Sequence, residues 1–193
     1  LVKRVAGFAP KRSMPTMYKT TLKRWYKKHR QQVAKHYTKK VYLFCDEFTN
    51  YNATETGIKA VLLLEKLGYE VVIPEHTESG RSWLSKGLLR KAKTIAEKNV
   101  RLLSPLINEQ TPLIGIEPSA ILTFRDEYID LADDAMLEET KRLSANVFTI
   151  EEFLSREADA GNITGKMFTT VQRKVIFHGH CHQKALSSVT PSV

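Results

Sequence analysis

The 193-residue sequence predicts an α/β fold: a parallel sheet of about four or five strands flanked by helices. Short apolar runs of strand length alternate four times with longer segments whose apolar residues recur at helical spacing. Polar and ligand-type residues follow these runs directly, which is typical of the carboxyl ends of parallel strands. At 42% apolar residues the chain can bury one good core.

The clearest unit begins with a strand at Val41–Phe44, followed by a loop at 46–52. A helix that starts at Thr54 and ends at Gly68 comes next, because Thr is a good N-cap and Gly a common C-cap. A second strand covers Tyr69–Ile73. Strand–helix–strand units of this length almost always join parallel strands.

The alternation continues to the end of the chain. A long helical pattern runs from Trp83 towards Leu106, and Pro112 precedes a third strand at 113–116. The last strand is expected at Val175–Phe177, so the order of elements is Rossmann-like. Shorter elements lie between the last two strands: helices at 118–128, 135–143 and 150–158 and a loop at 159–170.

The first 40 residues differ from the rest. They hold 13 of the 30 Lys and Arg residues and no Asp or Glu, so the formal net charge of +9 resides here. Gly7–Pro15 has the composition of an extended linker. We expect residues 1–40 to form a basic arm with one helix, and residues 41–193 to form the α/β domain. The helix would be capped by Thr20 or Thr21 and present Leu22, Trp25, Tyr26, His29 and Val33 on one face.

Composition restricts the partners of the arm. No nucleic-acid-binding motif accompanies the charge, so we expect no nucleic acid partner. An acidic protein face is the first alternative, and a membrane surface stays open because the helix is amphipathic and cationic. No apolar run is long enough to span a bilayer, and the sequence contains only two cysteines, Cys45 and Cys181. A reduced, cytoplasmic setting is the simplest expectation.

Three histidines and a cysteine follow the last apolar run: His178, His180, Cys181 and His182. They would either cap the strand and bond loop carbonyls or bind a metal ion. If the strands are parallel, the loops behind them meet at one edge of the sheet. That edge would carry Glu47, Asn50, Asn52, His76, Glu78, Ser79, Arg81, Glu117, Ser119 and the His/Cys group. A Gly-rich nucleotide fingerprint is absent after the first strand.

Several separate motifs in one order make the sequence resemble a known family. It is similar to the cysteine-rich CCG domain of iron–sulfur oxidoreductases, most of all to the C-terminal part of FAD-linked oxidases of the glycolate/D-lactate dehydrogenase type. The motifs are Gly7–Ser13, Phe48–Asn52, Gly80–Arg81, Ser85–Leu89, Glu117–Ser119, Leu122 with Arg125–Tyr128, Glu151–Leu154 and His178–Leu186.

The resemblance implies an electron-transfer or docking domain within a larger enzyme that oxidises a 2-hydroxy acid. Such an enzyme carries FAD and an iron–sulfur cluster, and its flavin domain and a second, similar half would be the partners of this chain. The resemblance also implies a fragment that stops before the second half and is not catalytic alone. Whether it counts as an enzyme is thus undecided from the sequence.

By the same resemblance, family members that bind a cluster have cysteines at the positions of Glu47, Glu78, Ser79 and Ala120. Of the cysteines that the resemblance leads us to expect, this sequence keeps only Cys181. Two alternatives stay open. A single metal ion would be held by Glu47, Glu78, His178, His180, Cys181 and His182, since carboxylate with imidazole suits zinc, iron or manganese. Otherwise Arg81 pairs with the glutamates, and the domain is a non-redox scaffolding or interaction domain that has lost its cluster.

Overall fold

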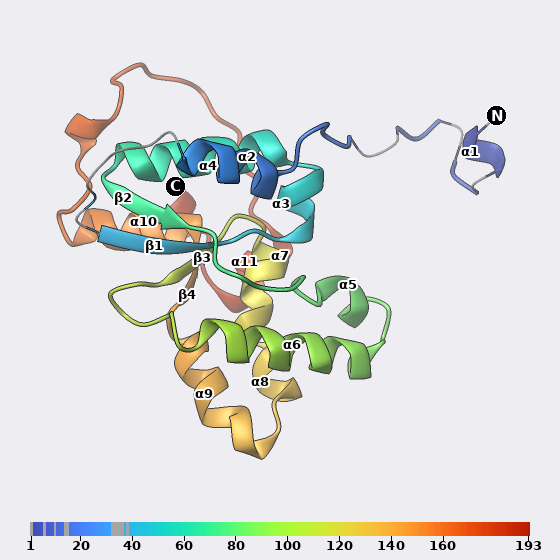
Figure 1. Cartoon of the computed structure of the whole chain (residues 1–193). Helices are drawn as coiled ribbons and strands as arrows, with labels where there is room; N and C mark the ends of the chain where they lie inside the picture. The colour runs from blue at the N-terminus through green and yellow to red at the C-terminus, as the bar shows by residue number, and fades with distance from the viewer. Residues whose placement is uncertain (1, 6, 10, 14–15, 32–36, 38) are drawn as a thin grey trace.

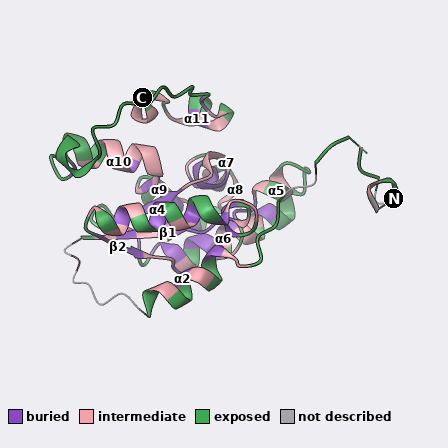
Figure 2. Ribbon diagram, turned by 90° about the horizontal axis from the view of Figure 1, so that it is seen from above, coloured by how far each residue is buried: buried purple, intermediate pink, exposed green. Residues whose placement is uncertain are grey.

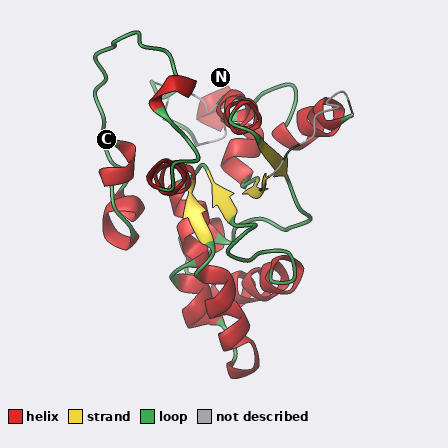
Figure 3. Ribbon diagram, turned by 90° about the vertical axis from the view of Figure 1, so that its left-hand side faces the viewer, coloured by secondary structure: helices red, strands yellow, loops and turns green. Residues whose placement is uncertain are grey.

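The chain folds around a sheet of four parallel strands (Figures 1 and 3). The computed structural model describes residues 2–5, 7–9, 11–13, 16–31, 37 and 39–193. The strand order is β2-β1-β3-β4, which confirms the predicted α/β class. The strands are β1 Lys39–Phe44, β2 Tyr69–Val72, β3 Leu113–Gly115 and β4 Val147–Thr149.

All four strands end at one edge, which we call the rim. Phe44 of β1 lies beside Gly115 of β3, and Gly115 lies beside Thr149 of β4. Position 115 needs a glycine for a steric reason: a Cβ atom there would lie 2.4 Å from the Cβ atom of Ile121. The helix that follows β3 can therefore pack directly on the strand end, and this brings its first turn to the rim.

One face of the sheet is covered by α2 (Leu22–Arg30), α4 (Thr54–Lys66) and α10 (Ile150–Asp159). Figure 1 shows α2 and α4 above the strands. Their buried side chains share one cluster with the strand residues that point to this side. The cluster includes Tyr26, Val41, Leu43, Val61, Leu64, Val71, Ile114 and Phe153.

The opposite face is covered by four helices. The core here contains Phe44, Leu113 and Val147 from the strands. Because successive side chains of a strand point to opposite faces, β1 contributes Leu43 to one core and Phe44 to the other. The helices are α6 Leu89–Leu103, α7 Pro118–Ile121, α8 Glu127–Leu131 and α9 Asp134–Ser144.

The prediction of a strand at Val175–Phe177 is wrong. These residues form no strand, and Val175 and Ile176 are 79% and 92% exposed. The fourth strand is instead β4, which lies between the helices expected at 135–143 and 150–158. A short segment with adjacent apolar residues becomes a strand only where a neighbouring strand supplies hydrogen bonds, and β3 supplies them to β4.

Two further elements differ from expectation. The pattern from Trp83 to Leu106 is split into α5 (Arg81–Leu84) and α6, because Gly87 adopts a φ of 71° between them. The expected loop at 46–52 contains the short helix α3 (Glu47–Tyr51). Asp46 caps this helix by accepting the N–H of Thr49 at 2.7 Å.

The helix of the basic arm forms as predicted, with Thr21 as its N-cap. Leu22 and Tyr26 are buried against the domain, so α2 belongs to its packing. The expected position of Val33, and parts of the expected linker Gly7–Pro15, lie outside the described residues.

No described helix has both the length and the apolar content needed to cross a bilayer. The remaining helices are α1 Val2–Val5, α11 Cys181–Leu186 and the short 3₁₀ turns η1 Leu122–Phe124, η2 Gly165–Met167 and η3 Thr190–Ser192.

Candidate functional site at the rim of the sheet

A cleft of about 390 Å³ opens at the rim, where the loops behind β1, β2 and β3 meet. The parallel strand order brings them together, as the sequence predicts. Residues 46–48 come from the first loop, Arg81 and Ser82 from the second, and Glu117, Ser119 and Ala120 from the third. The lining residues are Asp46, Glu47, Phe48, Arg81, Ser82, Glu117, Ser119 and Ala120.

Glu47 and Ser79 join two of these loops. The backbone N–H of Ser79 donates to one carboxylate oxygen of Glu47 at 3.0 Å, and the Ser79 hydroxyl donates to the other at 2.7 Å. Both carboxylate oxygens are therefore engaged within the protein. The pair acts as a polar cross-link between α3 and the loop behind β2.

The loop that carries Ser79 is fixed from beneath by two buried side chains of the helical layer. Tyr128 donates its hydroxyl hydrogen to the Ser79 carbonyl at 2.9 Å. Asn99 donates to the carbonyl of Glu78 at 2.8 Å and to the Tyr128 hydroxyl at 2.9 Å, and accepts the N–H of Thr77 at 2.8 Å. The rim loop is thus preorganised by the core of the domain.

Arg81 does not pair with Glu47 or Glu78, which corrects one of the alternatives drawn from the sequence. Its guanidinium forms an ion pair with Glu127 on α8, and it lies 3.2 Å from Nε2 of His182. Since guanidinium is a donor only, His182 accepts this hydrogen bond through Nε2. Arg81 therefore links the second loop to α8 and to the C-terminal helix α11.

The predicted metal ligands are only partly brought together. His180 lies 3.6 Å from Glu117 and caps α11 by accepting the N–H of His182 at 3.2 Å. Glu78 instead accepts a hydrogen bond from the Trp83 indole at 2.8 Å, and His178 and Cys181 are exposed. Among the residues that the structure describes, no three His, Cys, Asp or Glu side chains are grouped so that they would hold a metal ion.

A second ion pair holds α11 against the domain. Arg125 donates from one nitrogen to both carboxylate oxygens of Glu152, at 2.8 and 3.0 Å, and from the other to the carbonyl of Leu186 at 3.4 Å. The Ser187 hydroxyl also bonds to Glu152. Burial alone would raise the pKa of Glu152, but the hydrogen bonds from Ser187 and Arg125 and from the Thr149 N–H lower it. We call these residues the Arg125–Glu152 bracket.

Three buried titratable groups lie at the rim: Asp46, which lines the cleft, and His76 and Cys45 beside it. Burial raises the pKa of Asp46 to about 6, although the hydrogen bonds from Thr49 oppose this. Its Oδ2 atom is buried and has no hydrogen-bond partner among the described residues. Burial lowers the pKa of His76 to about 4, and its Nε2 accepts the N–H of Cys45 at 3.3 Å. Burial also raises the pKa of the Cys45 thiol to about 12, so Cys45 is not a reactive thiol.

The donor set of the rim does not fit the iron–sulfur cluster that the sequence resemblance implies. Such a cluster needs about four thiolates. At the expected cysteine positions the structure places Glu47 and Ser79 bonded to each other, Glu78 turned to Trp83, and the side chain of Ala120, which offers no ligand atom. The described residues offer two thiols near this edge, of which Cys45 is buried and Cys181 is exposed, too few for such a cluster.

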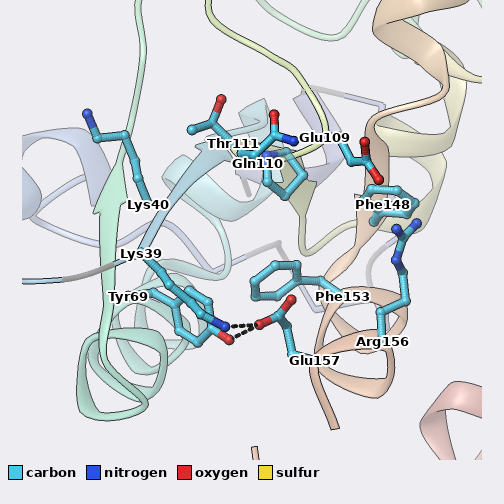
Figure 4. A pocket seen from close by; sticks show the side chains of 11 residues that line it. Lys39, Lys40, Tyr69, Glu109, Gln110, Thr111, Phe148, Phe153, Arg156 and Glu157 are labelled. Carbon is cyan, nitrogen blue, oxygen red and sulfur yellow. Dashed lines mark hydrogen bonds and ion pairs between the residues drawn. The ribbon is translucent and has the colours of Figure 1, made fainter. Parts of the chain in front are cut away.

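A second cavity, of about 480 Å³, lies at the opposite edge, where the strands begin (Figure 4). Its walls include the rings of Phe148 and Phe153. Arg156 lies over the Phe148 ring, with its guanidinium 4.3 Å from the ring centre. The complete lining is Lys39, Lys40, Tyr69, Glu109, Gln110, Thr111, Pro112, Phe148, Phe153, Arg156 and Glu157.

The polar groups of this second cavity are mostly paired. Glu157 accepts hydrogen bonds from the Tyr69 hydroxyl, from Lys39 at 3.0 Å and from Asn162 at 2.9 Å. The sequence does not indicate this cavity, because its lining combines residues from the starts of β1 and β2, the segment before β3, β4 and α10, and no single motif contains them. The heavy use of Glu157 in internal bonds indicates a structural role for that carboxylate.

Comparisons with known proteins show that the chain is similar to several proteins named D-2-hydroxyglutarate dehydrogenase. It is 30% identical over 115 residues to a D-2-hydroxyglutarate dehydrogenase of Pantoea ananatis, covering 60% of this chain and 11% of that protein. The D-2-hydroxyglutarate dehydrogenase of Escherichia coli is 29% identical over 136 residues, 70% of this chain and 12% of that protein. That of Haemophilus influenzae is 25% identical over 127 residues, 66% of this chain and 12% of that protein.

No protein-family model matches the chain, and no solved structure is significantly similar to it. The chain spans only about a tenth of the length of the curated relatives that it matches. The comparisons therefore relate this chain to one portion of D-2-hydroxyglutarate dehydrogenases.

Proposed function

We propose that this chain is an electron-transfer or docking domain of a larger FAD-linked iron–sulfur oxidoreductase that oxidises a 2-hydroxy acid. The observation that carries the proposal is the similarity to several proteins named D-2-hydroxyglutarate dehydrogenase, in one case over 70% of the chain. FAD would be bound by another domain of that enzyme, because the first strand of this chain is not followed by a nucleotide fingerprint.

The rim favours docking over electron transfer as the role of this domain. Glu47 and Ser79 tie together two loops that a cluster would otherwise hold, and the loop behind β2 is anchored by Tyr128. This arrangement keeps the rim rigid with a carboxylate–hydroxyl pair in place of thiolates. Electrons would then pass through centres in other parts of the enzyme.

A local similarity within the chain supports a second, similar half as a partner. In one segment, Lys40 and Val41 are adjacent, and Glu47, the first residue of α3, lies seven positions after Lys40. In the other, Lys174 and Val175 are adjacent, and Cys181, the first residue of α11, lies seven positions after Lys174. In both cases the residue before the helix caps it through its side chain.

The test uses the complete polypeptide that contains this chain. The purified enzyme is expected to show a flavin spectrum that bleaches with D-2-hydroxyglutarate, glycolate or D-lactate. Removal of the segment corresponding to residues 41–193 should leave substrate-dependent flavin reduction intact and abolish electron delivery to the acceptor. A complete polypeptide without flavin, or one that no 2-hydroxy acid reduces, would overturn the proposal.

The alternative is a non-redox scaffolding domain, and the cysteine-poor rim favours it. Metal and sulfide analysis separates this from the mixed-ligand metal site predicted from the sequence. A bound zinc, iron or manganese ion that disappears in Cys181→Ser would support the metal site, whereas unchanged metal content would remove Cys181 from the ligands. We also propose that the enzyme lies in the cytoplasm, because the chain has only two cysteines and they are far apart in sequence. Fractionation of cells that make the complete enzyme tests this location.

A further inference from the structure

Helix α2 presents a row of cations to solvent from a firmly held backbone. On the inner side of α2, Leu22 is fully buried and Tyr26 donates its hydroxyl hydrogen to the Val71 carbonyl at 2.7 Å. His29 lies 2.7 Å from the Glu65 carboxylate on α4. The outer side of the helix is therefore fixed in orientation relative to the sheet.

Four cations occupy that outer side: Lys23, Arg24, Lys27 and Lys28. Their spacing of one and four residues places them on one helical face, and all four are exposed. None of them forms an ion pair within the described part of the chain, in contrast to Arg30, which lies 3.6 Å from Glu70. Figure 2, seen from above, shows exposed stretches along α2 at the border of the molecule.

Exposed apolar side chains lie beside this row. Met17 is 74% exposed, Tyr18 38%, Phe48 51% and Tyr51 47%. The Tyr18 N–H donates to the Tyr51 carbonyl at 3.1 Å, so the segment before α2 lies against α3. Asn52 also donates to the Thr16 carbonyl at 2.8 Å. The four apolar side chains and the four cations together form what we call the basic–aromatic surface.

We propose that the basic–aromatic surface docks the protein on an anionic phospholipid bilayer. Clustered Lys and Arg are attracted to anionic lipid headgroups, and tyrosine rings favour the interfacial region, where one end is apolar and the other wet. Of the residues of this surface, Phe48 alone lines one of the two cavities described above, so the rest of the surface suits a broad, flat partner. Residues 41–193 contain more acidic than basic residues, and this asymmetry would turn α2 towards the lipid. The proposal does not depend on the proposed function.

The test is co-sedimentation of the purified chain with vesicles of phosphatidylcholine alone or mixed with phosphatidylglycerol. Binding is expected only to the mixed vesicles, and it should weaken as salt is raised. The Lys23→Gln/Lys27→Gln/Lys28→Gln variant should bind about 100-fold more weakly. The matched control, Arg90→Gln/Lys98→Gln/Arg101→Gln, removes the same charge from α6 on the opposite side of the sheet and should bind like the wild type.

A second variant tests the apolar half of the surface. Met17→Ser/Tyr51→Ser alters two exposed side chains, and it should weaken binding while preserving the salt dependence. Circular dichroism checks that each variant stays folded. Equal binding by the α2 variant and the α6 control would overturn the proposal, and so would binding to poly-glutamate without binding to mixed vesicles, which would indicate an acidic protein partner.

Discussion

The carboxylate of Glu47 accepts both the N–H and the hydroxyl of Ser79, and so it connects α3 with the loop behind β2. Hydrogen bonds to a charged acceptor are stronger than neutral ones, and two of them on one carboxylate fix its orientation. The contact joins residues 32 positions apart in sequence. Its loss would release the rim at the point where three strand-end loops meet.

We expect Glu47→Ala and Ser79→Ala each to lower the free energy of unfolding by about 1–3 kcal/mol. Because the two side chains contact each other, the double variant should cost less than the sum, with a coupling energy of about 1 kcal/mol. Urea denaturation of the wild type, the two single variants and the double variant measures this coupling energy. Glu138 and Lys141, an exposed pair 2.8 Å apart, form the control cycle, whose coupling should stay below about 0.5 kcal/mol. Equal coupling in both cycles would contradict the role given to Glu47.

Asp46 predicts an unusual pH dependence. Its pKa is raised from 3.8 to about 6, so the folded state binds the proton more tightly than the unfolded state does. The contribution to stability is therefore complete below about pH 4 and is lost as pH rises through about 6. Asp46→Asn keeps an N-cap for α3 but removes the titration.

Between pH 4 and pH 7 the stability of Asp46→Asn relative to wild type should rise by about 2–3 kcal/mol. Denaturation curves at the two pH values measure this difference. Asp159→Asn is the control, since Asp159 is exposed at the end of α10. A stability difference between wild type and Asp46→Asn that is the same at both pH values would show that Asp46 titrates normally.

Much of the fold follows from local sequence. The strands at 41–44, 69–73 and 113–116 were predicted within one or two residues, because each apolar run lies between clear turn or capping signals. The choice between β4 and 175–177 could not be made in this way. Both are short segments that contain adjacent apolar residues, and only the position of β3 determines which one gains a strand partner.

The convergence of the rim loops could also be predicted, since it follows from parallel strand order. The partners within the rim could not. Tyr128 and Asn99 reach the Ser79 loop from helices that are 20 to 50 residues away in sequence, and no local pattern encodes that contact. The pairing of Arg81 with Glu127 rather than with a rim glutamate likewise depends on how α8 packs.

Tyr26 tests how firmly the helix of the basic arm belongs to the domain. Tyr26→Phe removes the hydroxyl that donates to the Val71 carbonyl at 2.7 Å and leaves that acceptor buried. The free energy of unfolding should fall by about 1–2 kcal/mol. Thermal or urea unfolding measures the change. Tyr51→Phe, at a ring that is 47% exposed, is the matched control and should have little effect. An unchanged stability for Tyr26→Phe would mean that α2 contributes little to the domain.

The Arg125–Glu152 bracket makes a local rather than a global prediction. Arg125→Gln removes the charged donor that joins Glu152 to the Leu186 carbonyl, so α11 should detach more often while the sheet stays folded. Hydrogen exchange of the amides at 183–187 should accelerate by about tenfold or more, with little change in β1 or β3. Arg142→Gln, at an exposed position of α9, is the control and should exchange like the wild type.

The same bracket should respond to acid. The pKa of Glu152 is lowered in the folded state, so its contribution is complete above the ordinary value of 4.5 and is lost as pH falls through the lowered folded-state value. After correction for the intrinsic pH dependence of exchange, α11 of the wild type should lose protection in this acid range, whereas α11 of Arg125→Gln should already be less protected at neutral pH. If both proteins protect α11 equally at neutral pH, the helix is held by its apolar contacts with α7 and η1 instead.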